Sequence, residues 1–346
     1  MSQLSTPRRR FGAALPTWST VAMIAAAAVG VVQFGPSRLS AAKPFAAIDD
    51  GSSALSAGAS LNAFGSSREV MLRFALPNAP VEFPLEVSGD PAGLSYGWVP
   101  VRDTLAMDGP RAFAGEDLVA PSVPGFYRLA VLRGADRQII PQPTLAVMVP
   151  FAAKVGSSLN GYRIGTYLAE RFRGHTDHPA GFLEVQENDL GLRVSRHLTL
   201  GDFVTHDAQV DVWPKYVALN PRLLDKLELV LARIGGRARL AAQANGEQDV
   251  ALDVHSGFRT PLHNRAVRWS ARDSRHQYGD AADVAIDANG DGLVTLTDEL
   301  LVAQAVDQVE AEHPELVGGL GLYVSRRYRT PYVHIDARGK RTRWKG

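Results

Sequence analysis

The chain of 346 residues contains no cysteine, and this absence constrains the fold more than any other feature of the sequence. No disulfide and no thiolate metal site can hold the structure together, so each domain has to bury an apolar core of its own. The hydrophobic fraction of 45% is sufficient for such cores and excludes wholesale disorder. At this length we expect two or three domains. Any metal ion must be held by histidine and carboxylate groups.

The charges of the chain are balanced. Thirty-seven Lys and Arg residues against 36 Asp and Glu residues leave a formal charge of +1, and no long run of one sign appears. A protein that binds nucleic acid through a large basic face is therefore not expected.

Residues 1–45 are predicted to be an export signal or a membrane anchor. Arg8, Arg9 and Arg10 precede an apolar stretch over residues 13–34, and small residues follow at 40–42. This order is typical of a cleaved export signal, and its arginines are similar to a twin-arginine signal. The stretch is also long enough to remain in the membrane as an uncleaved anchor. Both interpretations place the rest of the chain outside the cytoplasm, in the periplasm or cell envelope.

The next part of the chain has no helical periodicity. Residues 46–66 are rich in Ala, Gly and Ser and are predicted to be a flexible linker. Residues 67–152 contain short apolar runs separated by Pro and Gly, which predicts an all-β, immunoglobulin-like sandwich. The clearest of these runs are 70–76, 127–132 and 144–149. Residues 153–212 are predicted to be a bridging β-rich region that includes a strand at 181–185.

The C-terminal part, residues 213–346, changes character. A helix is predicted over residues 221–234, because apolar residues recur there at steps of three and four. The residues that define this apolar face are Leu223, Leu224, Leu227, Leu231 and Ile234.

A group of metal-ligating residue types follows this helix. His276, Asp283 and His334 supply two imidazoles and one carboxylate. A catalytic zinc site without cysteine requires such a set, with the fourth position kept for water. Gly279 gives the chain freedom to turn between the first two residues. The seven-residue spacing of His276 and Asp283 is not by itself specific.

The motifs around these residues are more specific than their spacing. Residues 274–283 follow the pattern Ser-x-His-x-x-Gly-x-Ala-x-Asp, and Val-His-Ile-Asp follows at 333–336. Together with Ser-Gly-Phe-Arg-Thr-Pro at 256–261 and Gly-Gly-Leu-Gly-Leu-Tyr at 318–323, they resemble the D-alanyl-D-alanine carboxypeptidase and murein endopeptidase family of zinc peptidases. That family shares its metal site with the hedgehog signalling domain. The resemblance extends from about Ser195 to Trp344 and implies an α+β zinc peptidase domain after the all-β domain.

The resemblance also implies roles for individual residues. His276, Asp283 and His334 would be the zinc ligands, and Ser274 would line the substrate site. Arg259 would hold a substrate carboxylate or carbonyl oxygen, which suits its planar, charged fork. The reaction implied is zinc-assisted hydrolysis of the stem peptide of peptidoglycan.

The sequence departs from this family at the catalytic base. Many members have an acid three residues before the last His, or a second His two residues before it, where this chain has Pro331 and Tyr332. Asp336 can be the base, or it can orient a ligand from behind. Tyr332 can polarise the scissile carbonyl, or it can only pack.

A second metal site is predicted directly after Asp283. Residues 287–298 match a calcium loop, with oxygen ligands at positions 1, 3, 5, 7 and 12 and Gly292 at the sharp turn. The predicted ligands are Asp287, Asn289, Asp291, the carbonyl of Leu293, and Asp298. A helix pattern follows from residue 299 to 312. The alternative is an acidic surface turn that binds no metal.

The sequence therefore predicts an exported zinc metallopeptidase that remodels peptidoglycan, with a structural calcium ion. Peptidoglycan is the expected partner, and contact with a membrane is expected only through the N-terminal segment. Two alternatives stay open, a soluble D-Ala-D-Ala dipeptidase and a non-hydrolytic peptidoglycan-binding protein whose metal is structural.

Overall fold

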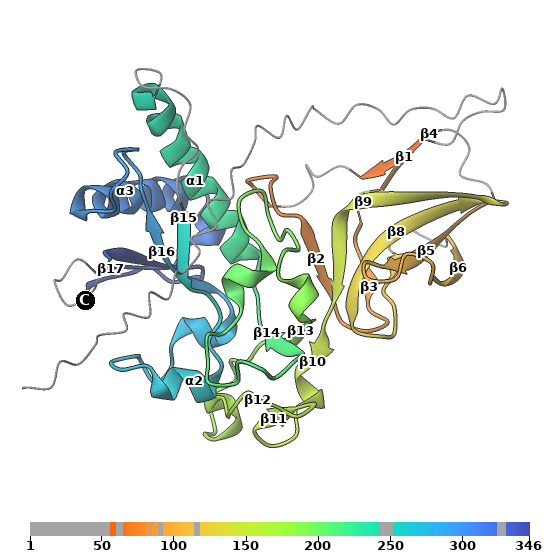
Figure 1. The fold of residues 1–346 in the computed structure, drawn as a ribbon, viewed down its shortest axis with the longest axis horizontal. Helices are drawn as coiled ribbons and strands as arrows, with labels where there is room; N and C mark the ends of the chain where they lie inside the picture. Colours follow the sequence, from red (N-terminus) through yellow and green to blue (C-terminus); the bar gives the residue numbers. More distant parts are fainter. Residues whose placement is uncertain are drawn as a thin grey trace, which may run out of the picture. The chain divides into compact units, whose positions relative to one another are not determined.

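The computed structural model describes residues 56–59, 65–83, 85–88, 93–113, 118–242, 252–323 and 330–346 (Figure 1). The predicted export segment and most of the predicted linker lie outside these residues. Within them, strands outnumber helices and form several sheets, which confirms a β-rich protein. No helix in the described ranges is long and apolar enough to cross a membrane.

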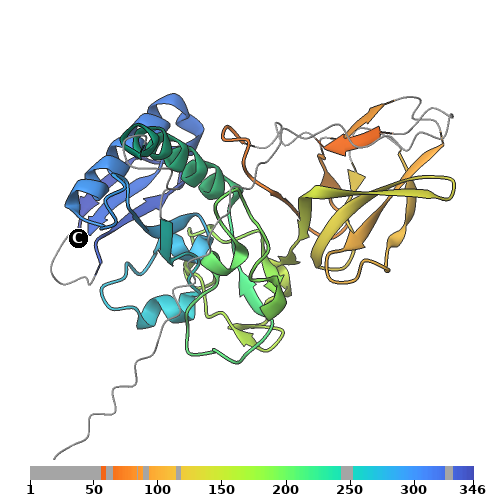
Figure 2. The same ribbon diagram turned by 45° about the horizontal axis from the view of Figure 1, so that its top comes forward.

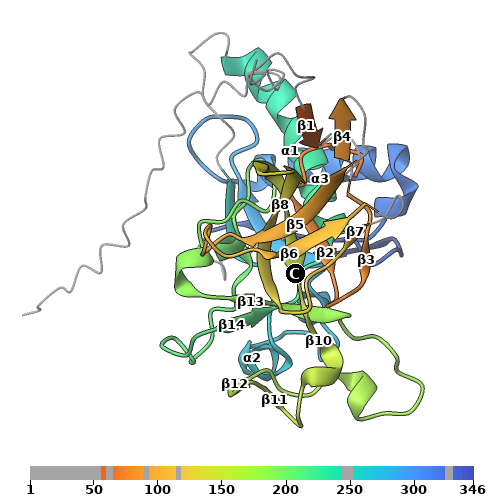
Figure 3. The same cartoon turned by 90° about the vertical axis from the view of Figure 1, so that its right-hand side faces the viewer.

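The N-terminal β-rich part is built around a five-stranded sheet, in the order β2-β9-β8-β5-β6 (Figure 3). Its strands are β2 (Leu72–Ala75), β5 (Leu94–Pro100), β6 (Asp108–Ala112), β8 (Gly125–Arg133) and β9 (Asp136–Val147). Neighbours are antiparallel except for the parallel pair β2 and β9. Two short pairs accompany the sheet, β1 (Ser56–Ala59) with β4 (Leu85–Ser88) and β3 (Pro80–Val81) with β7 (Leu118–Val119).

The two faces of this sheet contact different cores. Phe126 of β8 and Ala146 of β9 belong to a large core shared with the C-terminal half of the chain. Their neighbours Tyr127 and Leu145 belong to a smaller core around the fully buried Trp98. Since successive side chains of a strand point to opposite faces, the sheet is covered on both sides.

The bridging region contains short strands and single turns of 3-10 helix. β10 (Val149–Pro150), β13 (Gly181–Val185) and β14 (Lys215–Val217) form a three-stranded sheet, and β11 (Ser158–Leu159) pairs with β12 (Tyr162–Arg163). β13 confirms the strand predicted at 181–185. The 3-10 turns of this region are Leu168–Glu170, Glu187–Asp189 and Leu200–Phe203; Phe151–Ala153 lies at its start, and Arg275–Tyr278 and Pro314–Leu316 lie in the C-terminal part.

A second five-stranded sheet carries the C-terminal motifs, in the order β15-β16-β18-β17-β19. Its strands are β15 (Leu252–Ser256), β16 (Ala281–Ile286), β17 (Gly319–Tyr323), β18 (Tyr332–Asp336) and β19 (Thr342–Lys345). All neighbours are antiparallel except the parallel pair β17 and β19. β18 therefore lies between two strands that both precede it in the chain.

Helices α1 (Pro221–Ala242) and α3 (Leu296–Glu312) lie side by side against this sheet, and the short α2 (Pro261–Ala266) follows β15 (Figure 2). α1 confirms the predicted helix 221–234 and continues beyond it. The five residues of its predicted apolar face are all buried.

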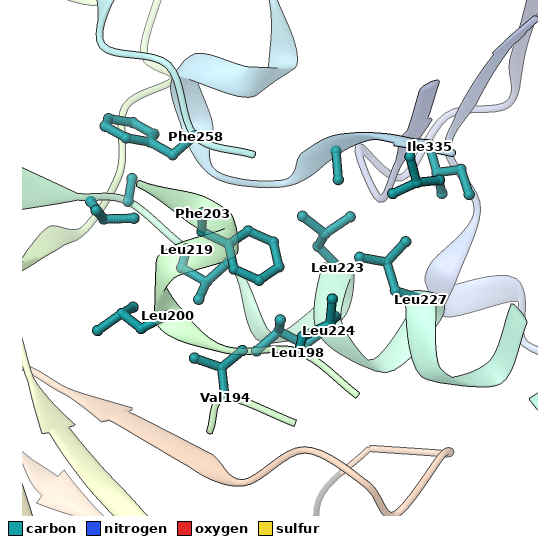
Figure 4. Packing of buried hydrophobic residues seen from close by; sticks show 14 of the residues in the cluster. Val194, Leu198, Leu200, Phe203, Leu219, Leu223, Leu224, Leu227, Phe258 and Ile335 are labelled. Carbon is teal, nitrogen blue, oxygen red and sulfur yellow. The ribbon is translucent and has the colours of Figure 1, made fainter. Parts of the chain in front are cut away.

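The apolar face of α1 joins the sheet to the bridging region. Figure 4 shows Leu223 and Leu227 facing Ile335 of β18, while Leu224 lies beside Leu198. Burial of each leucine contributes about 1.5–3 kcal/mol. This packing fixes β18, and with it the residues that face the other side of the sheet.

Candidate metal centre

His276, Asp283 and His334 converge at one buried point. The three residues are 1%, 6% and 6% exposed. Asp283 Oδ1 lies 3.1 Å from His276 Nε2 and 2.9 Å from His334 Nδ1, and the two imidazole nitrogens are 3.1 Å apart. Among the described residues, they are the one group of three or more His, Asp or Glu side chains whose ligand atoms all lie within 4.8 Å of one another. This group can hold a metal ion.

The sheet register and one glycine bring these residues together. Asp283 on β16 pairs directly with His334 on β18, so both side chains leave the same face of the sheet. His276 lies in the 3-10 turn just before β16, and Gly279 reverses the chain with φ +73°. A Cβ atom at Gly279 would lie 2.2 Å from the carbonyl oxygen of Ala218. Glycine is therefore required here for its backbone angle and for space, in agreement with the sequence prediction.

Each imidazole is oriented from its far side. His276 Nδ1 lies 2.6 Å from the carbonyl oxygen of Gly257, so it carries the proton and Nε2 faces the cluster. His334 is turned the other way, with Nε2 3.1 Å from Asp336 Oδ2 and Nδ1 facing the cluster. Such partners fix the tautomer and ring orientation of a metal ligand.

Asp336 is fully buried behind His334. Its Oδ1 accepts hydrogen bonds from the backbone N–H of Gly319 (2.7 Å) and from Arg338 Nε (2.9 Å). These donors and the contact with His334 hold the pKa of Asp336 far below its ordinary value, although burial acts in the opposite direction. Its place, on the His334 nitrogen that points away from the cluster, is that of a group that orients a ligand.

Arg259 reaches the cluster from the segment after β15. Its Nη2 contacts Asp283 Oδ2 and lies 3.2 Å from His276 Nε2, while its Nε donates to Ser256 Oγ at 2.7 Å. Asp283 thus presents one oxygen to the imidazoles and the other to Arg259. This division suits a carboxylate that binds an ion through one oxygen while its other oxygen is held by an arginine.

Burial and charge act on the protonation of the cluster. Burial lowers the pKa of His276, which favours the neutral imidazole that binds metals. Burial also acts to raise the pKa of Asp283, but the two histidines hold it well below its ordinary value, so it is ionised. Burial acts to lower the pKa of His334, but its bonds to Asp283 and Asp336 raise it above the ordinary value. Two imidazoles and one ionised carboxylate are the donor set of a catalytic zinc site.

A cavity of about 210 Å³ adjoins the cluster, and Arg259 belongs to both. Three of its lining residues are histidines, His206, His255 and His263. His255 lies at a register shift between β15 and β16, next to Asp283, and such bulges re-aim side chains. The cavity lining consists of Val204, His206, His255, Ser256, Phe258, Arg259, His263 and Val267.

Sequence reasoning missed the three cavity histidines. His255 directly precedes the Ser-Gly-Phe-Arg motif and His263 lies within the segment after it, so both could have been suspected from that motif. His206 has no local signal.

No family model, curated protein or solved structure matches this chain.

The other predicted site residues surround the centre. Ser274 directly precedes the 3-10 turn of His276 and is 9% exposed. The ring of Tyr332 stacks on Tyr323, with centroids 4.6 Å apart, and its centroid lies 5.7 Å from that of His255. Tyr332 therefore lies on the side of the sheet that carries the cavity histidine.

The predicted calcium loop is closed by its own carboxylates. Asp287 accepts hydrogen bonds from the backbone N–H groups of Gly290 and Gly292, each at 2.8 Å. Asp298 accepts from Ala288 N–H (3.0 Å) and also caps the start of α3. Three further bonds link the other predicted ligands, from Asn289 Nδ2 to Asp291, from Asp291 N–H to Asn289 and from Leu293 N–H to Asp291. The carboxylates of this loop do not form a second convergent group within the described residues.

Proposed function

We propose that this chain is an exported zinc metallopeptidase that hydrolyses peptide bonds in peptidoglycan stem peptides or crosslinks. The observation that supports it best is the buried convergence of His276, Asp283 and His334, with one nitrogen of each imidazole turned to a common point beside a cavity. The resemblance of the surrounding motifs supplies the substrate class. On this proposal the second sheet with its helices is an α+β peptidase domain, and the N-terminal sheet is part of an immunoglobulin-like domain.

The residues divide the work of hydrolysis as follows. His276, Asp283 and His334 would hold the ion, and zinc would supply Lewis-acid activation of water and of the scissile carbonyl. Gly257 and Asp336 keep the two imidazoles in their binding tautomers. Arg259 neutralises the outer oxygen of Asp283 and faces the cavity, where it can meet a substrate carboxylate or carbonyl oxygen.

The proton transfers fall to an imidazole. Apart from Arg259, the ionisable side chains that line the cavity are His206, His255 and His263, and none of the lining residues is an acid. His255 is the best placed of the three, because it lies beside Asp283 on the neighbouring strand and its Nε2 lies 2.9 Å from Asp253 Oδ2. An Asp partner orients a histidine for general acid–base catalysis.

The same lining favours one competing function. The cavity lining contains no carboxylate that could act as a base. A peptidoglycan-binding protein whose metal ion is structural needs no base, so the site as it stands also suits that function. The calcium ion proposed for residues 287–298 is structural in both cases.

Incubation of the purified chain and zinc with isolated murein sacculi, followed by profiling of released muropeptides, tests the proposal. New muropeptides that disappear in a His334→Ala variant would support the peptidase. Binding without new products would favour the binding protein, and hydrolysis of free D-Ala-D-Ala alone would favour the dipeptidase. The matched control is His313→Ala, a partly exposed histidine after α3 that lies outside the cavity lining and the metal cluster.

A further inference from the structure

Two loops, one of which leads into the 3-10 turn of His276, carry exposed arginine and aromatic side chains. Phe172 is 42% and Trp269 62% exposed. The loops meet where the guanidinium carbon of Arg272 lies 4.9 Å from the ring centroid of Phe172. We refer to the following residues as the arginine–aromatic platform: Arg171, Phe172, Arg173, Arg268, Trp269 and Arg272.

The described part of the chain does not neutralise the positive charge of the platform. All four arginines are exposed, and none of them forms an ion pair with any carboxylate that the structure describes. The nearby acids have other contacts, because Asp177 lies 3.5 Å from Arg275 and Asp273 accepts from the hydroxyl of Tyr278. On a chain with a formal charge of +1, this is a local concentration of charge whose complement is an anion.

The second loop is held in a shape that exposes its tryptophan. Trp269 has φ +61°, in the left-handed region that bulky residues rarely occupy because it is strained. Side chains on both sides fix the loop, with Asn264 Nδ2 donating to the Ala271 carbonyl (2.9 Å) and Gln277 Nε2 to that of Arg272 (3.1 Å). Strain of this kind persists at ligand-binding positions, where a fixed side chain binds without an ordering cost.

The platform continues from the rim of the cavity. Val267, which lines the cavity, directly precedes Arg268, and His276 follows Arg272 by four residues. A ligand bound on the platform can therefore extend into the cavity. The cavity has a volume of about 210 Å³ and can hold only one part of such a ligand. A ligand that fills the cavity and also covers the platform therefore has to be an extended molecule.

We propose that the arginine–aromatic platform binds the anionic, polymeric part of the substrate, a carboxylate-rich peptide–glycan strand, while one peptide bond of that strand lies at the metal centre. The planar fork of arginine matches a carboxylate, and exposed Trp and Phe rings contact the apolar faces of an extended chain. The inference rests on the proposed function and goes further, because the platform makes the enzyme selective for the polymer over short soluble peptides.

A binding experiment without metal tests the platform separately from hydrolysis. The full chain is sedimented with isolated sacculi in the presence of chelator. The platform pair is the double variant Arg171→Gln with Arg268→Gln. The control pair is the double variant Arg137→Gln with Arg222→Gln, at two exposed arginines elsewhere. We expect about tenfold weaker binding for the platform pair and less than about twofold for the control pair, since each exposed charge contributes only a small part of the binding free energy. Trp269→Ala should weaken binding without changing charge.

Competition identifies the anion. Poly-glutamate should displace the protein from sacculi more effectively than a single-stranded oligonucleotide of equal charge; the reverse order would assign the platform to a phosphate polymer and overturn the proposal. Equal loss of binding in both arginine pairs, or unchanged binding in the platform pair, would also overturn it.

Cleavage with zinc is then measured on sacculi and on a short soluble peptide. The platform pair should raise KM for sacculi while kcat and the short-peptide kinetics stay unchanged. If no preparation cleaves either substrate but metal-free binding still depends on the platform, the proposed hydrolysis fails and the platform remains. If the platform pair cleaves sacculi with unchanged KM, the platform is not part of substrate binding.

Discussion

At the scale of single residues, an isosteric change at Asp336 separates the orienting role that we propose for it from the role of a base. Asp336→Asn keeps the shape of the side chain behind His334 but removes its charge. If Asp336 orients His334, we expect zinc affinity to fall about 10–100-fold and hydrolysis to recover at saturating zinc. If Asp336 is the base, hydrolysis stays low when the site is filled.

Zinc titration against a competing chelator, with hydrolysis measured at each occupancy, gives both quantities. Asp136→Asn, at an exposed hairpin position, is the matched control and should change neither. Unchanged zinc affinity together with lost hydrolysis would contradict the orienting role.

At the scale of elements, the loop 287–298 follows β16, starts four residues after Asp283 and includes the first turn of α3. Without a cation, the carboxylates of Asp287 and Asp291 repel each other. An ion that binds only the folded chain adds about 2.7 kcal/mol to its stability at a hundredfold excess over Kd. We expect millimolar calcium to raise the melting temperature, and Asp287→Ala with Asp291→Ala to abolish the increase and to weaken zinc binding.

Asp298 is left unchanged in that variant because its side chain caps α3, and its substitution would by itself lower the stability of the fold. Thermal melts with calcium and with a calcium-selective chelator, at fixed zinc, measure the effect. Equal melting temperatures in the wild-type chain would show that the segment is an acidic turn.

The first turn of α3 contains a carboxyl group that makes folding stability depend on pH. Burial raises the pKa of Glu299 to about 7, from an ordinary value of 4.5. Between these values the folded chain keeps a proton that the unfolded chain releases, so stability is greatest below pH 4.5 and falls as the pH rises to about 7. Glu299→Gln should remove this fall, which is on the order of 1–3 kcal/mol.

The measurement is the difference in unfolding free energy between pH 5 and pH 8, for wild type and variant. Glu187→Gln, on an exposed 3-10 turn, should leave the wild-type difference unchanged. A Glu299→Gln variant with the full wild-type difference would show that Glu299 is ionised in the folded chain at pH 5.

At the scale of the whole molecule, the large core contains residues from Val70 to Ile335, with Phe126 and Ala146 of the N-terminal sheet among them. Because this core is shared, we expect the two five-stranded sheets to unfold together. Hydrogen exchange of peptides from β8 and β18 across a denaturant series should give coincident midpoints. Loss of protection in β8 at a lower denaturant concentration would show that the N-terminal sheet unfolds independently.

The sequence predicts local features of this fold well and long-range ones poorly. The apolar face of α1 and the strand β13 follow from periodicity, which is local. The residue types of the motifs predict that His276, Asp283 and His334 converge. Their spacing alone does not, because it contains no information about the register of β16 and β18. The contribution of His206 to the cavity and the packing of Val70 into the large core depend on tertiary contacts with no local pattern.

The central place of β18 also determines when the second sheet can form during synthesis. β16 and β17 leave the ribosome first, yet each has an edge that only β18 pairs with, and that edge stays open until residue 336 has emerged. Open strand edges attract other chains, so the nascent protein is most prone to aggregation in this interval. The ion-binding group is completed in the same step, because His334 arrives with β18. Loading with metal therefore follows the closure of the sheet, and a chain interrupted before residue 332 lacks the middle strand of the sheet as well as the border strand β19.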